Sequence, residues 1–206
     1  MPELTGDLIR LSKDQICATS EMFTRAFFDD PKLTYLIPDA EIRKERARFL
    51  FEFELRYGMI YGDVYATSPT LEGAAVWLSS AKSEITFWRA TRAGGIALQK
   101  HLGKDIMKRL MSFSTFVDTL HKKHAPSPHY YLFFIGVDPV SQKKGFTSKL
   151  LRPMLAWLDR WKQPCYLNTQ NQKNIGLYEH FGFRVIDEIK VPETSIIHTA
   201  MQRKPQ

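Results

Sequence analysis

The chain has 206 residues, of which 44% are hydrophobic and 25% are charged, and its formal net charge is +7. The length suits a single domain, residues 1–206, with a sizeable core, and the composition is ordinary for a soluble globular protein. No apolar run approaches membrane-spanning length, and the first residues lack the basic end and apolar core of a signal peptide. We therefore expect a cytoplasmic protein with no membrane partner.

The positive charge is concentrated in residues 82–206. A basic surface is compatible with nucleic acid, but it serves an anionic cofactor equally well. The chain contains neither an arginine-rich run nor a recognisable nucleic-acid motif, so we expect no nucleic-acid partner.

The sequence offers no metal-binding pattern. Cys17 and Cys165 are far apart and belong to no C-x-x-C pair, which indicates two buried thiols and no disulfide. His121 and His124 could share one helix face, but they have no third ligand nearby. We expect a solvated helix end there, and no metal.

The first part of the chain alternates strand and helix patterns. Residues 7–11 alternate as a short strand does, and residues 13–28 have helical spacing with Ser12 as N-cap. This helix is expected to stop at the acidic residues before Pro31, because proline disfavours α geometry in the residue before it. A second helix follows over residues 40–58, with its Arg, Lys and Glu residues on a solvated face.

Residues 63–67 and 72–78 are predicted to be paired strands joined by a turn. Residues 82–124 then read as helical, in about three pieces divided by Gly94-Gly95 and Gly103. Apolar residues form a stripe along the last piece, opposite a basic side. The stripe indicates core packing or the cover of a substrate pocket, and the pattern alone does not separate the two.

The second part of the chain gives clearer boundaries. The sequence predicts a buried strand, a helix, a strand, a short helix ended by Gly182, and two final strands, over residues 130–137, 147–162, 165–169, 175–181, 183–191 and 196–203.

The loop between the first of these strands and its helix suits an anionic ligand. A helix start leaves several backbone N–H groups without partners and carries partial positive charge. Lys143 and Lys144 add formal charge, and Gly145 allows a positive φ or a close approach of the backbone to a ligand. Neither standard nucleotide-binding glycine pattern is present, and an ordinary strand-to-helix turn with solvated lysines is the alternative.

Two blocks of the sequence resemble a known family. The first, GVDPVSQKKGFTSKLL, resembles the Q/R-x-x-G-x-G/A loop, and the second, YLNTQNQKNIGLYEHFGF, resembles the N-x-x-x-Y-x-x-x-G-F pattern. Together they resemble the GNAT superfamily of acetyl-CoA-dependent N-acetyltransferases. The ending VPETSIIHTAMQRKP is similar to the puromycin-acetyltransferase-like branch. The close resemblance covers residues 129–206.

The resemblance implies an α/β (α+β) fold, a GNAT-like single domain. Its central sheet would be mixed, mostly antiparallel and twisted, with six to seven strands flanked by helices. The parallel central strands, residues 130–137 and about 165–170, would splay apart around acetyl-CoA. Residues 82–124 would be a helical insertion, and residues 129–206 the cofactor-binding and catalytic half.

The resemblance also implies the residues that bind acetyl-CoA. Backbone groups near Ile135, Gly136 and Val137 would hold the pantetheine arm and polarise the acetyl carbonyl. Asn174 would contact the same arm. The pyrophosphate would lie on the amides of Gln142, Lys143, Lys144, Gly145, Phe146, Thr147 and Ser148. Thr147 replaces the family's Gly or Ala, so that its methyl group would crowd the cofactor or its hydroxyl would donate a hydrogen bond to it.

Tyr178 would be the general acid that protonates the leaving thiolate, because a phenol is an O–H donor with a pKa above that of a thiol. The alternative is an aromatic core residue. The general base is not assigned, because residues 130–137 contain no acid. The candidates are His129, Glu72, Asp29 and Asp30.

The hypothesis is an enzyme that acetylates a primary amine of a small molecule, with acetyl-CoA as co-substrate and no metal. A peptide or protein N-acetyltransferase and a non-catalytic acyl-CoA-binding module on the same fold are the alternatives. A homodimer is possible by family analogy.

Overall fold

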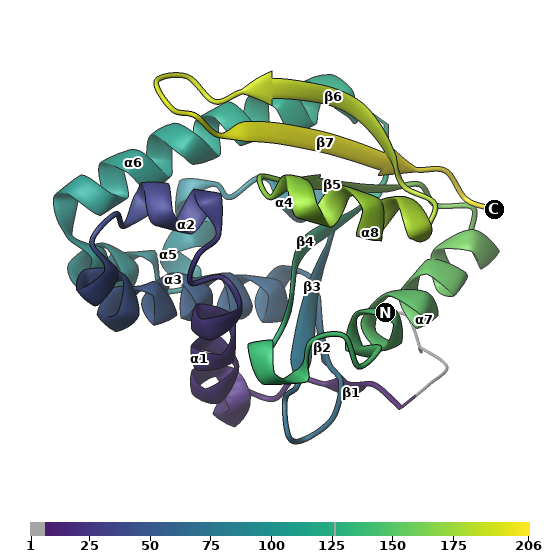
Figure 1. Cartoon of the computed structure of the whole chain (residues 1–206), viewed down its shortest axis with the longest axis horizontal. Coiled ribbons are helices and arrows are strands. Elements are labelled where there is room, and N and C mark those ends of the chain that lie inside the picture. Colours follow the sequence, from purple (N-terminus) through teal and green to yellow (C-terminus); the bar gives the residue numbers. More distant parts are fainter. Residues whose placement is uncertain (1–6, 126) are drawn as a thin grey trace.

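The computed structural model describes residues 7–125 and 127–206 and shows one mixed sheet with helices on both faces (Figure 1). The sheet has the strand order β1-β2-β3-β4-β5-β7-β6. The strands are β1 (Ile9–Arg10), β2 (Asp63–Ala66), β3 (Gly73–Ser79), β4 (Tyr130–Val137), β5 (Cys165–Thr169), β6 (Arg184–Lys190) and β7 (Ile197–Arg203). Every pairing is antiparallel except that of β4 with β5. The predicted fold class and strand number are confirmed.

Helices make up most of the remaining chain. They are α1 (Ile16–Ala26), α2 (Pro31–Leu36), α3 (Ala40–Tyr61), α4 (Ser80–Ser83), α5 (Phe87–Arg92), α6 (Gly95–His124), α7 (Phe146–Arg160) and α8 (Ile175–His180). Short 3-10 turns lie at η1 (Lys13–Gln15), η2 (Pro139–Ser141) and η3 (Gln172–Asn174). In the part of the chain that the structure describes, no helix is both long and apolar enough to cross a bilayer.

Strand β3 is buried on both faces, which explains its uninterrupted apolar sequence. Val76 and Leu78 point into a core shared with α1, α3 and α6, whereas Ala75 and Trp77 point into a second core shared with α7 and α8. This alternation is the period of two expected of a strand. The sheet therefore separates two hydrophobic cores.

Strands β4 and β5 diverge soon after they begin. Their parallel ladder contains only two pairs, Tyr130 with Cys165 and Tyr131 with Tyr166. The other edge of β4 pairs with β3 along its whole length, with a bulge that leaves Phe133 without an opposite residue. Beyond Tyr131 the facing edges of β4 and β5 are unpaired, so the predicted splay is confirmed.

The predicted helices of residues 82–124 are confirmed, and the longest of them has a break. Residues 82–124 hold α5, α6 and the end of α4. Gly103 lies inside α6 with φ 77° and ψ 171°, outside helical geometry. The helix is therefore interrupted where the sequence placed a division.

Helix α2 was not predicted. Pro31 occupies its first turn, and Asp30 is its N-cap, accepting a hydrogen bond from the Lys32 amide at 2.9 Å. Proline is well suited to the first helical position, because its missing N–H would have had no helical partner there. The same residues that end α1 therefore begin α2.

Two predictions about side-chain environment are wrong. Cys17 is exposed on α1, and only Cys165 is a buried thiol; both are free. His121 is also buried, because α6 packs on the sheet there. Its Nε2 lies 2.7 Å from that of His129, and its ring stacks on Tyr166 at 4.4 Å. Burial lowers the pKa of His121 to about 3, so the expected solvated helix end is a neutral, packed contact.

Candidate active site

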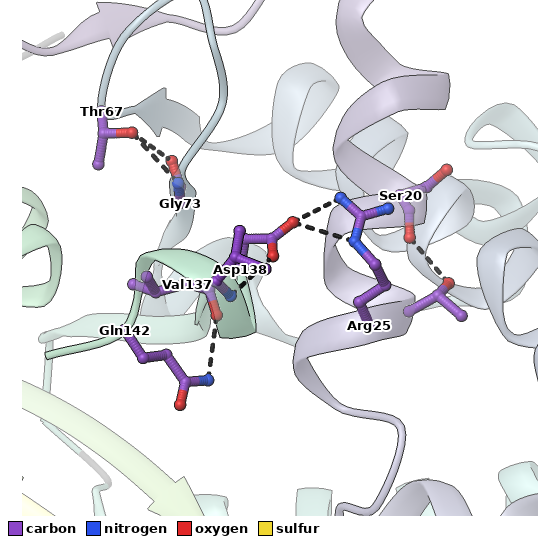
Figure 2. A network of polar contacts seen from close by, with 9 residues as sticks. Ser20, Arg25, Thr67, Gly73, Val137, Asp138 and Gln142 are labelled. Atoms are coloured by element: carbon purple, nitrogen blue, oxygen red, sulfur yellow. Dashed lines mark hydrogen bonds and ion pairs between the residues drawn. The ribbon is translucent and has the colours of Figure 1, made fainter.

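The end of β4 is fastened to α1 by an ion pair. Asp138, directly after the strand, accepts hydrogen bonds from Arg25 Nη2 at 2.5 Å and Nε at 3.0 Å (Figure 2). Its other carboxylate oxygen accepts from the Val140 amide at 3.2 Å and caps η2. The side-chain amide of Gln142 donates to the Val137 carbonyl at 3.3 Å. These contacts fix the path of the loop that leads to α7.

The loop before α7 presents unpartnered amides. Gly145, with φ 84°, is the N-cap of α7 and offers no capping side chain. Among the described residues no hydrogen bond uses the amide N–H of Phe146, Thr147 or Ser148. A Cβ added at Gly145 would meet nothing within 4 Å, so the space in front of these amides is open. An anion is stabilised in such a place by the N–H groups and the helix dipole.

The lysines of this loop take different positions. Lys143 has a positive φ of 61°, and the Lys144 ammonium donates to the Val140 carbonyl at 2.9 Å. The run of residues predicted to bind pyrophosphate, Gln142 to Ser148, thus forms one short loop and helix start. Their contacts with acetyl-CoA stay a prediction.

Gly136 has a packing reason for its lack of a side chain. A Cβ there would lie 2.7 Å from a ring carbon of Phe27 and 2.8 Å from one of Phe23. Its neighbours Ile135 and Val137 face the opposite core, with α7. The absence of a side chain at Gly136 therefore lets α1 lie directly against β4.

A cavity of about 740 Å³ opens beside the splayed strands. Its walls come from α2, α3, α5, α6, β4, β5 and α8, and they are mostly apolar. Ile135 and Asn168 bring it to the unpaired edges of β4 and β5, and Asn174 and Tyr178 line it from the side of α8. The cavity thus joins the cleft between the strands to a pocket under the helical insertion.

Tyr178 is 7% exposed and lines this cavity. Burial, and then the negative charge of Asp30, raise the pKa of its phenol. Its ring packs edge-on against Phe183 at 6.1 Å, and among the described residues its hydroxyl has no hydrogen-bond partner. Tyr178 therefore packs in the core and also keeps a free O–H at the cavity, and its role as general acid stays a prediction.

Residues 112–183 match the model of the acetyltransferase (GNAT) family. The match begins within α6 and ends at Phe183, shortly after α8. This part of the chain is similar to the GNAT acetyltransferase family. The matched span includes the loop before α7 and Tyr178, the two blocks that carry the resemblance in the sequence. No comparison tests the puromycin-acetyltransferase-like branch, which stays a prediction.

Other proteins are similar to this chain over most of its length. An uncharacterized N-acetyltransferase of Schizosaccharomyces pombe is 28% identical over 166 residues, covering 77% of this chain and 66% of that protein. A Corynebacterium glutamicum structure, named histone acetyltransferase HPA2 and related acetyltransferase, has a TM-score of 0.70 and 19% identity over 97% of this chain and 96% of its own. Arylalkylamine N-acetyltransferase 2 of Aedes aegypti has a TM-score of 0.64 and 14% identity, over 97% of this chain and 99% of its own. The two structures show the shared fold.

One of the four candidate bases lines the cavity. Asp30 does so, and burial raises the pKa of its carboxyl against the opposing effects of the Lys32 amide and ammonium. Asp29 is not among the lining residues. The structure therefore brings Asp30 and Tyr178 to one cavity.

The other two candidates are held elsewhere. The Glu72 carboxylate accepts hydrogen bonds from Thr67, Ser68 and Thr70, which lower its pKa to about 2. His129 is bonded to His121 and to the Ser127 carbonyl. Neither Glu72 nor His129 lines the cavity, and their contacts explain them as structural groups.

Two further acids at the cavity escaped the sequence analysis. Glu54 is only 5% exposed, although the charged residues of its helix were expected on a solvated face. Burial raises the pKa of the Glu54 carboxyl. Burial also raises the pKa of the second acid, Asp118 on α6, to about 6. One signal was available: Glu54 follows Leu50 by four residues and so lies on the apolar side of α3.

Proposed function

We propose that this protein transfers an acetyl group from acetyl-CoA to a primary amine of a small molecule. The observation that carries the proposal is that Tyr178 and Asp30 line one cavity, which reaches the unpaired edges of β4 and β5. A proton donor and a proton acceptor are thus available in a cavity that reaches the opening between the two strands.

The residues present fit acetyl-CoA. The open space at Gly145 and the free amides of Phe146, Thr147 and Ser148 suit a pyrophosphate. The unpaired backbone of β4 beyond Tyr131 suits an amide-rich pantetheine arm. Bound acetyl-CoA supplies the thioester whose carbonyl carbon the amine attacks.

The side chains of the cavity would move two protons. Asp30 accepts the proton that the ammonium form of the amine must lose, directly or through water, and the freed amine forms the new C–N bond. As the C–S bond breaks, Tyr178 donates its hydroxyl proton to the sulfur, and the nitrogen, which is cationic after its attack, loses its second proton to water. A phenol with a raised pKa stays protonated at neutral pH, which this role requires. Solvent then restores both groups.

The walls of the cavity favour a small molecule over a peptide. Phe87 and Ile96 from the helical insertion, together with Leu33 of α2, contribute to a lining that surrounds the cavity from several sides. A peptide chain would need an open groove that passes through the site. Peptide or protein N-acetylation therefore remains the second candidate, and acyl-CoA binding without catalysis is the third.

The first test is Tyr178→Phe. This change keeps the ring that packs on Phe183 and removes only the hydroxyl. We expect acetyl-CoA binding, measured by calorimetry, to stay within about twofold, and amine-dependent thiol release to fall about 100-fold, the loss typical of a general acid. Turnover at the wild-type rate would show that Tyr178 is not the acid. Saturable acetyl-CoA binding without turnover of any amine would favour the non-catalytic module.

A further inference from the structure

The carboxylate of Glu54 is incompletely satisfied inside the cavity. Its Oε1 lies 3.6 Å from Lys32 Nζ, beyond hydrogen-bond distance. Its Oε2 is fully buried and has no hydrogen-bond partner among the residues that the structure describes. A buried carboxylate left in this state is costly, so a native structure needs a reason for it.

Lys32 does not remove this cost, because it serves two acids. Its positive charge opposes the effect of burial on the pKa of both Asp30 and Glu54. All three residues line the cavity. Lys104 and Lys108 also line the cavity but are exposed. Exposed ammonium groups are screened by water and compensate a buried charge weakly.

Glu54 and Tyr178 line the cavity from different elements, Glu54 from α3 and Tyr178 from α8. A substrate that fills the cavity with its amine at Tyr178 therefore also contacts the α3 wall that holds Glu54.

Resting on the proposed function, we propose that Glu54 is a specificity residue that accepts a hydrogen bond from a second donor group of the acceptor amine. The substrate is then an amine with an apolar body and an ammonium or hydroxyl group distant from the reacting nitrogen. The apolar body would lie against the carbon-rich walls, which include Leu36, Leu50, Phe53 and Phe113.

Three amines of equal chain length test this assignment: hexylamine, aminohexanol and diaminohexane. Their flexible chains adjust to the separation of the two acids. We expect the wild-type protein with CoA present to bind diaminohexane, and to a lesser degree aminohexanol, about tenfold more tightly than hexylamine in calorimetry. Tighter binding of both compounds than of hexylamine would indicate that Glu54 accepts any hydrogen-bond donor. Tighter binding of diaminohexane alone would indicate that Glu54 requires a cation.

Glu54→Gln is the decisive variant. It keeps the side-chain volume and removes the charge, so the preference for diaminohexane should fall about tenfold while hexylamine binding stays the same. Glu52→Gln is the matched control, because Glu52 lies on the same helix, pairs with Arg56 and does not line this cavity. An unchanged preference in Glu54→Gln, or no preference in the wild-type protein, would overturn the assignment.

A failure of the proposed function would look different. Tyr178→Phe should lower thiol release with all three amines alike and leave their binding preference intact. If the protein prefers diaminohexane to hexylamine in binding but turns over neither, acetyl transfer is rejected and the Glu54 subsite is kept. If it turns over the amines but shows no such preference, acetyl transfer is kept and the Glu54 subsite is rejected. If Glu54→Gln does not fold, Glu54→Asp keeps the charge near Lys32 but withdraws the carboxylate, and the same loss of preference is expected.

Discussion

Asp30 combines a structural and a chemical property in one carboxylate. One oxygen accepts the Lys32 amide and caps α2, while the residue lines the cavity that Tyr178 shares. Asparagine caps a helix about as well as aspartate but is not a base. The cap and the proton acceptor can therefore be separated by one substitution.

We expect Asp30→Asn to leave the unfolding free energy within about 0.5 kcal/mol, because the cap is retained. Its kcat/KM for an accepted amine should fall about 100-fold, the contribution of a positioned general base. Asp39→Asn is the control, since Asp39 caps α3 in the same way at 2.9 Å and is exposed. Equal activity of the two variants would mean that Asp30 is only a cap.

The same assignment fixes the pH dependence. Asp30 must be ionised to accept a proton, so kcat/KM should rise as the pH rises through its pKa. The ordinary pKa of aspartate is near 4. Because burial raises the pKa of Asp30, the rise in kcat/KM should lie at a higher pH than that. The raised pKa of Tyr178 removes any loss from this residue below about pH 10. A pH profile of Asp30→Asn that retains the acidic rise would contradict this account.

At the scale of single residues, the sequence predicted Tyr178 and included Asp30 among the possible bases, because motif spacing and loop position are visible in it. It gave no role to Glu54 and misjudged Cys17 and His121. Burial depends on what packs against a helix from distant parts of the chain. Charged and polar residues such as Glu54 and His121 are assigned to solvent by default, and a free cysteine such as Cys17 to the core. Only the tertiary structure shows which residues depart from these defaults.

Among the elements, the strand that carries the site was predicted with its observed bounds, 130–137, and so was its partner, 165–169. Dense apolar runs bounded by turn residues explain this accuracy. Helix α2 was missed because Pro31 acts as both a stop and a start signal, and six residues are too few to show periodicity. The splay of β4 from β5 came from the family resemblance alone, since strand patterns do not encode where a ladder ends.

The loop before α7 makes a sharp test of the phosphate site. Gly145→Glu places bulk and negative charge in the open space at the free amides, so acetyl-CoA binding in calorimetry should be lost. Gly145→Ala is the control, because it shares the backbone strain at φ 84° without the charge. We expect Gly145→Ala to weaken binding by about tenfold or less. Wild-type affinity in Gly145→Glu would place the pyrophosphate elsewhere.

At the scale of the whole molecule, one ion pair joins β7 to the helices that precede it in the sequence. Arg203 of β7 is 4% exposed and binds both carboxylate oxygens of Asp159 on α7, at 2.6 and 2.7 Å. Its Nε also donates to the Phe181 carbonyl, after α8, at 3.0 Å. The pair therefore joins a strand to the two helices that flank the candidate acetyl-CoA site.

We expect Asp159→Ala to lower the unfolding free energy in urea by about 3 kcal/mol, because it leaves a buried guanidinium unpaired. Asp105→Ala, on the exposed side of α6, should change it by less than about 0.5 kcal/mol. Arg203 lowers the pKa of Asp159, so the pair's contribution is present above the ordinary aspartate pKa and is lost as the pH falls through the folded value. If the urea concentration at the midpoint of unfolding is the same for Asp159→Ala as for the wild-type protein, the ion pair does not stabilise the fold.

The walls of the cavity and the loop proposed to bind acetyl-CoA come from different stretches of the chain. Most of the wall belongs to residues 27–118, whereas the loop and the start of α7 occupy residues 138–148. Substitutions in the first stretch can accumulate without disturbing the second. New acceptor molecules are thus within evolutionary reach of this scaffold through its walls, with the donor chemistry inherited unchanged.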